Sequence, residues 1–213
     1  MKKIVSIVFA SIVFTTSAFA GGLIGLKLGN GELEAHKEGV TNTLAPHDAA
    51  ETKSVDEMYG AIFGEINVND GPLNLGFELV PLTGTVSVAN DDSDASVELS
   101  NLKTIYALAA KEVGSGSIYA KLGYSKADID NAKQSSGNNT INSFSDELEG
   151  PMVGIGFQSA ENSNGLVFRA EATHSEFDDV QVQTTRKPDN RVETKKASDI
   201  TFQTITISVA KTF

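Results

Sequence analysis

The chain has 213 residues, contains neither cysteine nor tryptophan, and carries a formal net charge of −11 at pH 7. The absence of cysteine excludes a disulfide framework, a thiolate metal site and a lipid-modified N-terminal cysteine. The acidic balance argues against nucleic acid as a partner, because the sequence has no basic stripe.

The first twenty residues have the pattern of a secretory leader. Lys2 and Lys3 precede an apolar run over residues 4–14, and Ala18-Phe19-Ala20 forms a small-x-small cleavage site. The run is too short to cross a bilayer as a helix. We therefore expect residues 1–20 to be a cleaved signal peptide and residues 21–213 to form one domain.

Eight later segments read as β-strands, because apolar and polar residues alternate along most of them. They cover residues 22–35, 57–68, 72–83, 102–113, 117–127, 149–160, 165–177 and 200–213. In the last one, Ile205, Ile207, Val209 and Phe213 share one face. In 57–68 and 102–113 both faces carry apolar residues. For 57–68 we favour an apolar face of Met58, Ile62, Ile66 and Val68, and for 102–113 the register stays open.

The connections between these segments alternate in length. Residues 69–72, 114–116 and 161–165 are rich in Asn, Asp, Gly and Pro, as in tight hairpin turns. Longer polar connections cover residues 36–56, 84–101, 128–148 and 178–199. This pattern predicts an eight-stranded antiparallel up-and-down transmembrane β-barrel with short periplasmic turns and long extracellular loops.

Alternation alone fits a soluble barrel equally well. The composition of the polar face distinguishes a soluble barrel, in which this face meets water, from a membrane barrel, in which it lines the lumen. This face is dominated by Gly, Thr, Ser and Asn, with few charges of both signs, which suits a narrow lumen better than a water-exposed surface. The charges that we place in the lumen are Lys27, Glu65, Glu78, Lys121, Arg169 and Glu171. We expect them to form a structural ion-pair core, because buried charges must pair. The alternative is a gated ion path.

Four segments resemble the small eight-stranded outer-membrane barrels of the OmpA/OmpX type, within the opacity-type group. They are residues 118–124, 154–157, 166–171 and 205–213. The resemblance implies that Ile205, Ile207, Val209 and Phe213 are the signal read by the barrel assembly machinery. Lys211 departs from that signal, where an apolar or aromatic residue is more usual.

No candidate catalytic or metal site stands out. His174 and Ser175 invite a hydrolase interpretation, but adjacent strand residues point to opposite faces. His36 and His47 lack the spacing of metal ligands. Asp91, Asp92 and Asp94 form an acidic loop in which a solvated surface is favoured over a divalent-cation site.

We therefore expect a non-enzymatic surface protein of the Gram-negative outer membrane, without cofactor or metal, that serves adhesion or envelope integrity. The expected partners are outer-membrane lipid and lipopolysaccharide, the assembly machinery and an extracellular ligand of the loops, and the barrel is expected to be a monomer. Two alternatives stay open: narrow porin-like passage of ions or small hydrophobic compounds, and an outer-membrane lipid hydrolase.

Overall fold

A computed structural model describes residues 21–37, 51–68, 71–87, 95–134, 139–187 and 190–213. These residues form ten β-strands and no helix long and apolar enough to cross a membrane. The strands are β1 (Gly22–Lys37), β2 (Glu51–Asn67), β3 (Leu73–Ser87), β4 (Ala95–Val113), β5 (Gly116–Gln134), β6 (Asn139–Phe144), β7 (Glu147–Ser159), β8 (Leu166–Phe177), β9 (Val180–Arg186) and β10 (Arg191–Thr212).

Eight of these strands close into a barrel. Every neighbouring pair is antiparallel, in the order β1-β2-β3-β4-β5-β7-β8-β10, and β10 pairs back onto β1. The closing seam runs from Leu23 opposite Thr212 to Lys37 opposite Ala197. Gly22 and Phe213 complete it with two backbone hydrogen bonds of 3.1 and 3.0 Å. The expected eight-stranded antiparallel barrel is confirmed.

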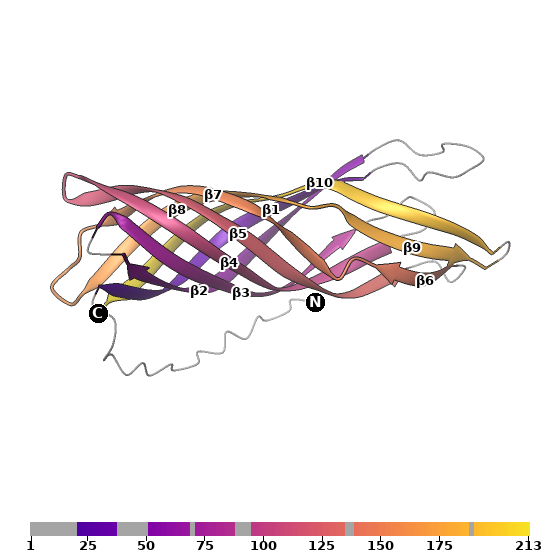
Figure 1. The fold of residues 1–213 in the computed structure, drawn as a ribbon, viewed down its shortest axis with the longest axis horizontal. Coiled ribbons are helices and arrows are strands. Elements are labelled where there is room, and N and C mark those ends of the chain that lie inside the picture. Colours follow the sequence, from indigo (N-terminus) through magenta and orange to yellow (C-terminus); the bar gives the residue numbers. More distant parts are fainter. Residues whose placement is uncertain (1–20, 38–50, 69–70, 88–94, 135–138, 188–189) are drawn as a thin grey trace.

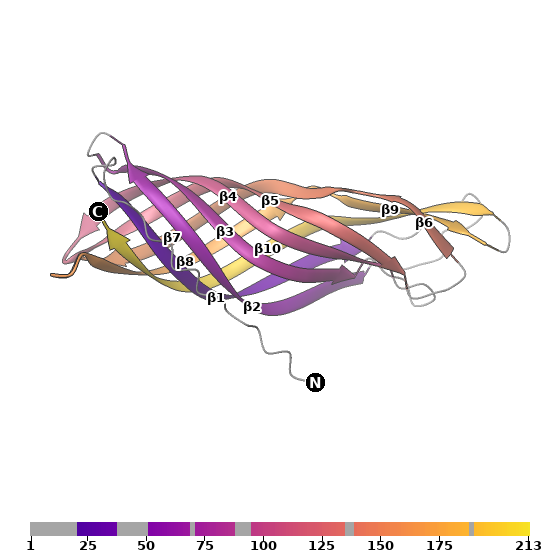
Figure 2. The same ribbon diagram turned by 90° about the horizontal axis from the view of Figure 1, so that it is seen from below.

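The barrel has two different ends, which lie at the left and right of Figure 1, where the long axis is horizontal. At the end called here the turn end, β1 begins, β10 finishes and short connections join β2 to β3, β4 to β5 and β7 to β8. At the opposite end, the loop end, β6, β9 and the first half of β10 project beyond the other strands (Figures 1 and 2). There β9 pairs with both β10 and β6.

The strand boundaries at the loop end differ from those expected. The segments assigned to long polar connections contain β6, β9 and the loop-end parts of β2, β3, β4, β5 and β10. The bounds predicted for the four long connections were therefore wrong, because each of them contains strand residues. The connections still alternate in length as predicted.

Large apolar side chains form a band around the outside of the barrel. Its most exposed members include Ile205, Ile207, Ile155 and Leu122, at 75%, 68%, 69% and 66% exposure. Met58 and Ile66 also point outward, as the favoured face of 57–68 requires, whereas Val68 of that face lies beyond the end of β2. Soluble monomers rarely expose an apolar surface of this extent, so the band marks the part of the wall that faces lipid.

The interior changes character along the barrel. Leu23, Phe63, Val167 and Ala210 form a small apolar cluster at the turn end. Charged and hydroxyl side chains occupy the middle. The loop end is filled by a larger apolar cluster, called here the loop-end core, whose buried members are Ala35, Val97, Ala127, Ile129, Leu148, Phe177, Val180, Val182, Ala197 and Ile200.

Candidate functional site

Six charged side chains meet in the middle of the barrel. They sit at inward positions of five strands, and each is 7% exposed or less: Lys27 on β1, Glu65 on β2, Glu78 on β3, Lys121 on β5, and Arg169 and Glu171 on β8. Period-2 alternation brings them together, because every inward position of a closed barrel points at the same axis. Three cations face three carboxylates, so the formal charge of the group is balanced.

Four of these groups form a closed ring of alternating charge. The Lys27 Nζ lies 2.6 Å from Glu78 Oε2 and 2.6 Å from Glu171 Oε1. The Lys121 Nζ lies 3.1 Å from the same Glu78 oxygen and 3.2 Å from the same Glu171 oxygen. Each lysine therefore bridges two carboxylates, and each carboxylate is shared by two lysines. Such sharing offsets the desolvation cost that a single buried charge would carry.

The remaining two charges form a bidentate pair. Arg169 donates from Nη1 to Glu65 Oε1 at 2.6 Å and from Nη2 to Glu65 Oε2 at 2.8 Å. Its Nε donates to Gln158 Oε1 at 2.6 Å, and the Tyr106 hydroxyl donates to Glu65 Oε1 at 2.9 Å. Two parallel charge-assisted hydrogen bonds fix the guanidinium plane as well as its position. Arg169 thus pairs with Glu65, and not with Glu78 or Glu171.

Two tyrosines connect the ring to this pair, and neither was among the site residues expected from the sequence. The Tyr119 hydroxyl donates to Glu171 Oε2 at 3.0 Å, and its ring lies 5.3 Å from the Arg169 guanidinium carbon. The Lys121 Nζ lies 3.8 Å from the centre of the Tyr106 ring. Tyr119 is in phase with Lys121 on the same strand, so its alternation could have placed it in the lumen. The two-sided apolar pattern of 102–113 hid Tyr106.

The arrangement is suited to holding the barrel shut. Each of the three carboxylates accepts from at least one cation within 3.2 Å, so each is engaged in an ion pair. Among the described residues, the buried side-chain atoms without a hydrogen-bond partner are Asn67 Oδ1 and Thr184 Oγ1, and neither belongs to the network. A satisfied buried polar network rigidifies the structure that contains it.

Comparison with solved structures identifies the architecture. The outer membrane protein OprG from Pseudomonas aeruginosa superposes with a TM-score of 0.66 at 11% identity, over 90% of this chain and 96% of that one. The outer membrane protein AlkL, in lipid bilayers, superposes with a TM-score of 0.57 at 9% identity, over 96% of both chains. The fold is that of the small outer-membrane β-barrels.

These identities establish the fold alone, and the activities of those proteins do not transfer with it. No protein family model matches the chain, and no curated protein matches its sequence. The resemblance noted in the sequence is therefore confirmed at the level of architecture.

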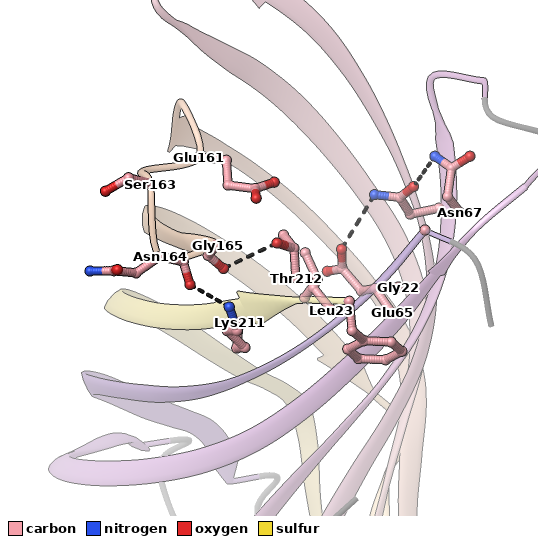
Figure 3. Close-up of a pocket in the computed structure, with 13 residues that line it drawn as sticks. Gly22, Leu23, Glu65, Asn67, Glu161, Ser163, Asn164, Gly165, Lys211 and Thr212 are labelled. Atoms are coloured by element: carbon pink, nitrogen blue, oxygen red, sulfur yellow. Dashed lines mark hydrogen bonds between the residues drawn. The ribbon is translucent and has the colours of Figure 1, made fainter. Parts of the chain in front are cut away.

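The turn end of this outer-membrane-type barrel contains a hollow of about 650 Å³, drawn in Figure 3. It is lined by Gly22 and Phe213 at the rim and reaches Glu65 inside. From Glu65 a chain of side-chain amides leads to the rim: Asn74 donates to Glu65 at 3.4 Å, and Asn67 donates to Asn74 at 2.8 Å. The hollow therefore brings the solvent of the turn end close to the charge network.

Beside the same hollow, the last strand, β10, is hydrogen-bonded to the turn that precedes β8. Thr212 Oγ1 donates to the Gly165 carbonyl at 3.1 Å, and Lys211 Nζ donates to the Asn164 carbonyl (Figure 3). Lys211, which departs from the expected assembly pattern, thus has a contact at the turn. Ile205, Ile207, Val209 and Phe213 all face outward. Their role in assembly stays a prediction.

The other candidate residues are not assembled into a site. Ser175 is buried, whereas the neighbouring His174 side chain is 39% exposed and lies 3.4 Å from Glu176, so the two point to opposite faces. His36 Nδ1 lies 3.2 Å from Thr52 Oγ1. The part of the chain that the structure describes contains no group of three or more His, Cys, Asp or Glu suited to a metal ion.

Three predictions concern residues outside the described ranges. They are the signal peptide over 1–20, His47 in the first long connection, and the acidic loop of Asp91, Asp92 and Asp94. Residues 135–138 and 188–189, within the predicted long connections 128–148 and 178–199, also lie outside.

Proposed function

We propose that this protein is a monomeric barrel of the Gram-negative outer membrane whose lumen is sealed and whose loop end is the functional surface, serving adhesion or envelope integrity. The turn end faces the periplasm and the loop end faces outward. The observation that carries the proposal is the charge-balanced network, because a lumen filled by satisfied ion pairs leaves no wide path for a solute.

The loop end supports the second half of the proposal. β10 has 22 residues. A tilted strand needs only about 9–11 residues to cross a bilayer, so β10 is about twice as long as the membrane requires. Its first half pairs with β9, and β9 pairs with β6, so the wall continues beyond the apolar band. A sheet raised above the membrane is a rigid platform for contact with an external partner.

The hairpin of β9 and β10 offers a direct test. Gln183 pairs with Thr194, so residues 184–193 can be replaced by Asn-Gly, which closes a two-residue turn in the same register. Val180, Val182 and Ala197 of the loop-end core are retained. We expect the shortened form to reach the outer membrane in normal amounts and to lose surface binding.

The readouts separate the two roles within the proposal. Cells without the protein, cells with the full chain and cells with the shortened hairpin are compared for attachment to surfaces and for sensitivity to detergent. Loss of attachment in the shortened form assigns the function to the loop end. Detergent sensitivity that appears only when the whole barrel is absent assigns it to envelope integrity. If neither property changes in either strain, the proposal is wrong.

A second candidate is a narrow ion path, which the hollow at the turn end favours because it reaches Glu65. On that candidate the Arg169–Glu65 pair is a constriction and the protein conducts in planar bilayers. On our proposal the full chain gives no single-channel steps.

Secretion and assembly follow from the same proposal. The leader over residues 1–20 directs export, and the assembly machinery recognises the outward row that ends at Phe213. We expect deletion of Phe213 to lower the amount of folded barrel in the outer membrane and to leave export across the inner membrane unchanged. Unchanged amounts of heat-modifiable protein on unheated gels would contradict this role.

A further inference from the structure

The part of the sheet that projects at the loop end finishes in an open edge. β6 is the last strand in the order β10-β9-β6, and among the described strands it pairs with β9 alone (Figures 1 and 2). Its neighbour in the chain, β5, pairs with β7 only as far as Asp128 opposite Glu147. The Ile129 amide donates to the Asp146 carbonyl at 2.9 Å at that point. Beyond it, the side of β6 that faces away from β9 has no partner strand among the described residues.

The backbone of β6 presents hydrogen-bonding groups on this open side. The Ser145 amide donates to the Gln181 carbonyl at 3.0 Å, so it points towards the β9 strand. Successive residues of a strand direct their backbone groups to opposite sides, so the N–H and C=O of Phe144 point to the open side. Unpaired backbone groups of this kind are a template for a further strand.

The two margins of the projecting sheet differ in charge. Sheet edges in proteins are usually protected by charged residues or proline. β6 reads Asn-Thr-Ile-Asn-Ser-Phe and contains neither. The opposite margin, residues 191–196 of β10, has three basic residues in its sequence, Arg191, Lys195 and Lys196. The β6 margin is therefore the neutral one, and a basic segment can approach it.

The side chains of β6 define what an added strand must carry. Ile141 and Phe144 pack against the loop-end core and are half-buried. Asn142 and Ser143 are exposed. An added strand continues both faces of the sheet. Its residues therefore need to be alternately apolar, to cover Ile141 and Phe144, and polar, to lie beside the exposed side chains.

Two carboxylates at the base of the edge add a preference for positive charge. Asp130 and Asp146 are exposed, and in the described part of the chain neither forms an ion pair. By contrast, the neighbouring Asp128 pairs with Lys103. A strand added antiparallel to β6 begins at this base, and the antiparallel direction is the slightly more stable one. Basic residues at the start of that strand complement the two carboxylates.

We propose that the open edge of β6 takes up an extended segment of an external peptide or protein by strand addition. The segment runs antiparallel to β6, begins with basic residues beside Asp146, and continues with apolar and polar residues in alternation. The inference rests on the proposed function, because it names the kind of partner that the loop end binds.

The membrane disfavours a second copy of the chain as the occupant. Two barrels in one membrane that form a symmetric pair are related by a two-fold axis along the membrane normal. Their β6 strands then run in the same direction with opposite faces, and such strands cannot continue one sheet. An extended segment from outside has no such restriction.

The cysteine-free chain allows a test by disulfide trapping. Ser143 lies opposite Gln183, and Gln183 opposite Thr194, so Ser143→Cys and Thr194→Cys place one thiol at the same level on the two margins. The probe is the capped peptide Lys-Lys-Val-Cys-Val-Thr, whose cysteine meets position 143 when its first valine lies opposite Phe144. Each variant is reconstituted in phosphocholine vesicles and incubated with the probe in a glutathione redox buffer. Mass spectrometry gives the fraction of mixed disulfide.

We expect Ser143→Cys to trap about tenfold more probe than Thr194→Cys, the effect of one or two net hydrogen bonds. The backbone of the peptide supplies a second, independent control. N-methylation of the first valine, whose N–H faces β6, should abolish the excess. N-methylation of the second lysine, whose N–H faces away from β6, should leave it unchanged.

The charge preference is tested in the Ser143→Cys background. Asp130→Asn combined with Asp146→Asn should lower trapping about threefold, as expected for exposed ion pairs. Glu32→Gln combined with Asp56→Asn makes the same change of charge at exposed positions of β1 and β2 and should have no effect.

The outcomes separate this inference from the function on which it rests. Equal trapping on the two margins, or trapping that survives N-methylation of the first valine, overturns strand addition at β6 and leaves the loop-end function to its own tests in cells. Disulfide-linked pairs of Ser143→Cys barrels that form without the probe make a second copy the occupant and overturn the external segment. Trapping as expected, in a barrel whose loss changes neither attachment nor detergent sensitivity, keeps the edge and overturns the proposed function.

Discussion

The middle of the lumen and the loop-end core are both interior, but they are built from opposite chemistry. The middle is held by Lys27, Glu78, Glu171 and their partners, whereas the loop-end core packs residues such as Leu148, Phe177 and Val182. Beside the middle the outer wall is apolar, and beside the loop-end core it carries exposed charges such as Asp130 and Asp178. The barrel therefore has a polar interior and an apolar surface where it faces lipid, and an apolar interior and a charged surface where it faces water.

The first way to break this comparison is to remove one partner of the bidentate pair. Arg169→Ala leaves the Glu65 carboxylate buried without its cation, which we expect to cost about 3–5 kcal/mol of unfolding free energy. Urea unfolding of the reconstituted barrel measures the loss. Adding Glu65→Gln should recover much of it, because the second change removes the unpaired charge. A stable Arg169→Ala barrel with altered conductance would instead support an ion path.

The second test acts on the loop-end core. Leu148 is 2% exposed, and Leu148→Ala removes its volume from a packed apolar cluster, at an expected cost of about 3 kcal/mol. Leu148→Met keeps the volume and should cost less than about 1.5 kcal/mol. Val192→Ala, at an outward position that is 56% exposed, is the control and should be nearly neutral. If Leu148→Ala unfolds like the control, the loop-end core is not a packed core.

The contrast between the two regions also explains what the sequence could and could not reveal. In the lipid-facing part, outward apolar residues alternate with inward polar ones, so segment 165–177 was found almost to the residue. Towards the loop end the same strands continue, but there the apolar residues point inward. A search for alternation with an apolar outer face therefore stops where the apolar residues change from the outer to the inner face.

Bulges at the same level add to the difficulty. Asn101 in β4 and Asp199 in β10 have φ values of 51° and 48°, and the strand register shifts beside each of them. One extra residue moves every later side chain to the other face. This is why β4 places Tyr106 and Leu108 inside by one parity and Val97 by the other. The amino-acid sequence carries no pattern that marks such a bulge. The loop-end parts of β4 and β10 were therefore assigned to connections.

The charge network was easier to anticipate than its pairing. Five of the six charges stand on strands whose outer faces are clear, so their inward position follows from alternation, and Glu65 follows from the face favoured for 57–68. Which carboxylate meets Arg169 depends on the stagger between strands that are far apart in sequence, such as β2 and β8. That stagger is set by closure of the barrel and cannot be read from any single strand.

A smaller expected effect concerns the hydroxyl that joins the two halves of the network. Tyr119→Phe removes the 3.0 Å hydrogen bond to Glu171 and keeps the ring beside Arg169. Because Glu171 retains both lysines, we expect a loss of about 1.5 kcal/mol in urea unfolding. Tyr124→Phe removes a hydroxyl that faces outward on the same strand and hydrogen-bonds Glu149 in contact with solvent, so as the control it should cost less than about 0.5 kcal/mol. Equal effects would show that the lumen hydroxyl contributes nothing beyond its ring.

The smallest effect is expected where the two chemistries meet on the outer wall. Lys103 and Asp128 form an ion pair of 3.2 Å with side chains that are 48% and 37% exposed. Water and salt screen such a pair, so Lys103→Ala should cost about 0.2–1 kcal/mol, and the cost should fall as salt is raised towards 1 M. Arg169→Ala, by contrast, should show almost no dependence on salt, because Arg169 and Glu65 are only 6% and 4% exposed. The salt dependence of each loss of unfolding free energy therefore reports whether the charge is exposed or buried, whatever the size of that loss. If the two losses respond to salt alike, then ions reach the lumen network as freely as the outer surface, and the sealed barrel has to be abandoned for an open one.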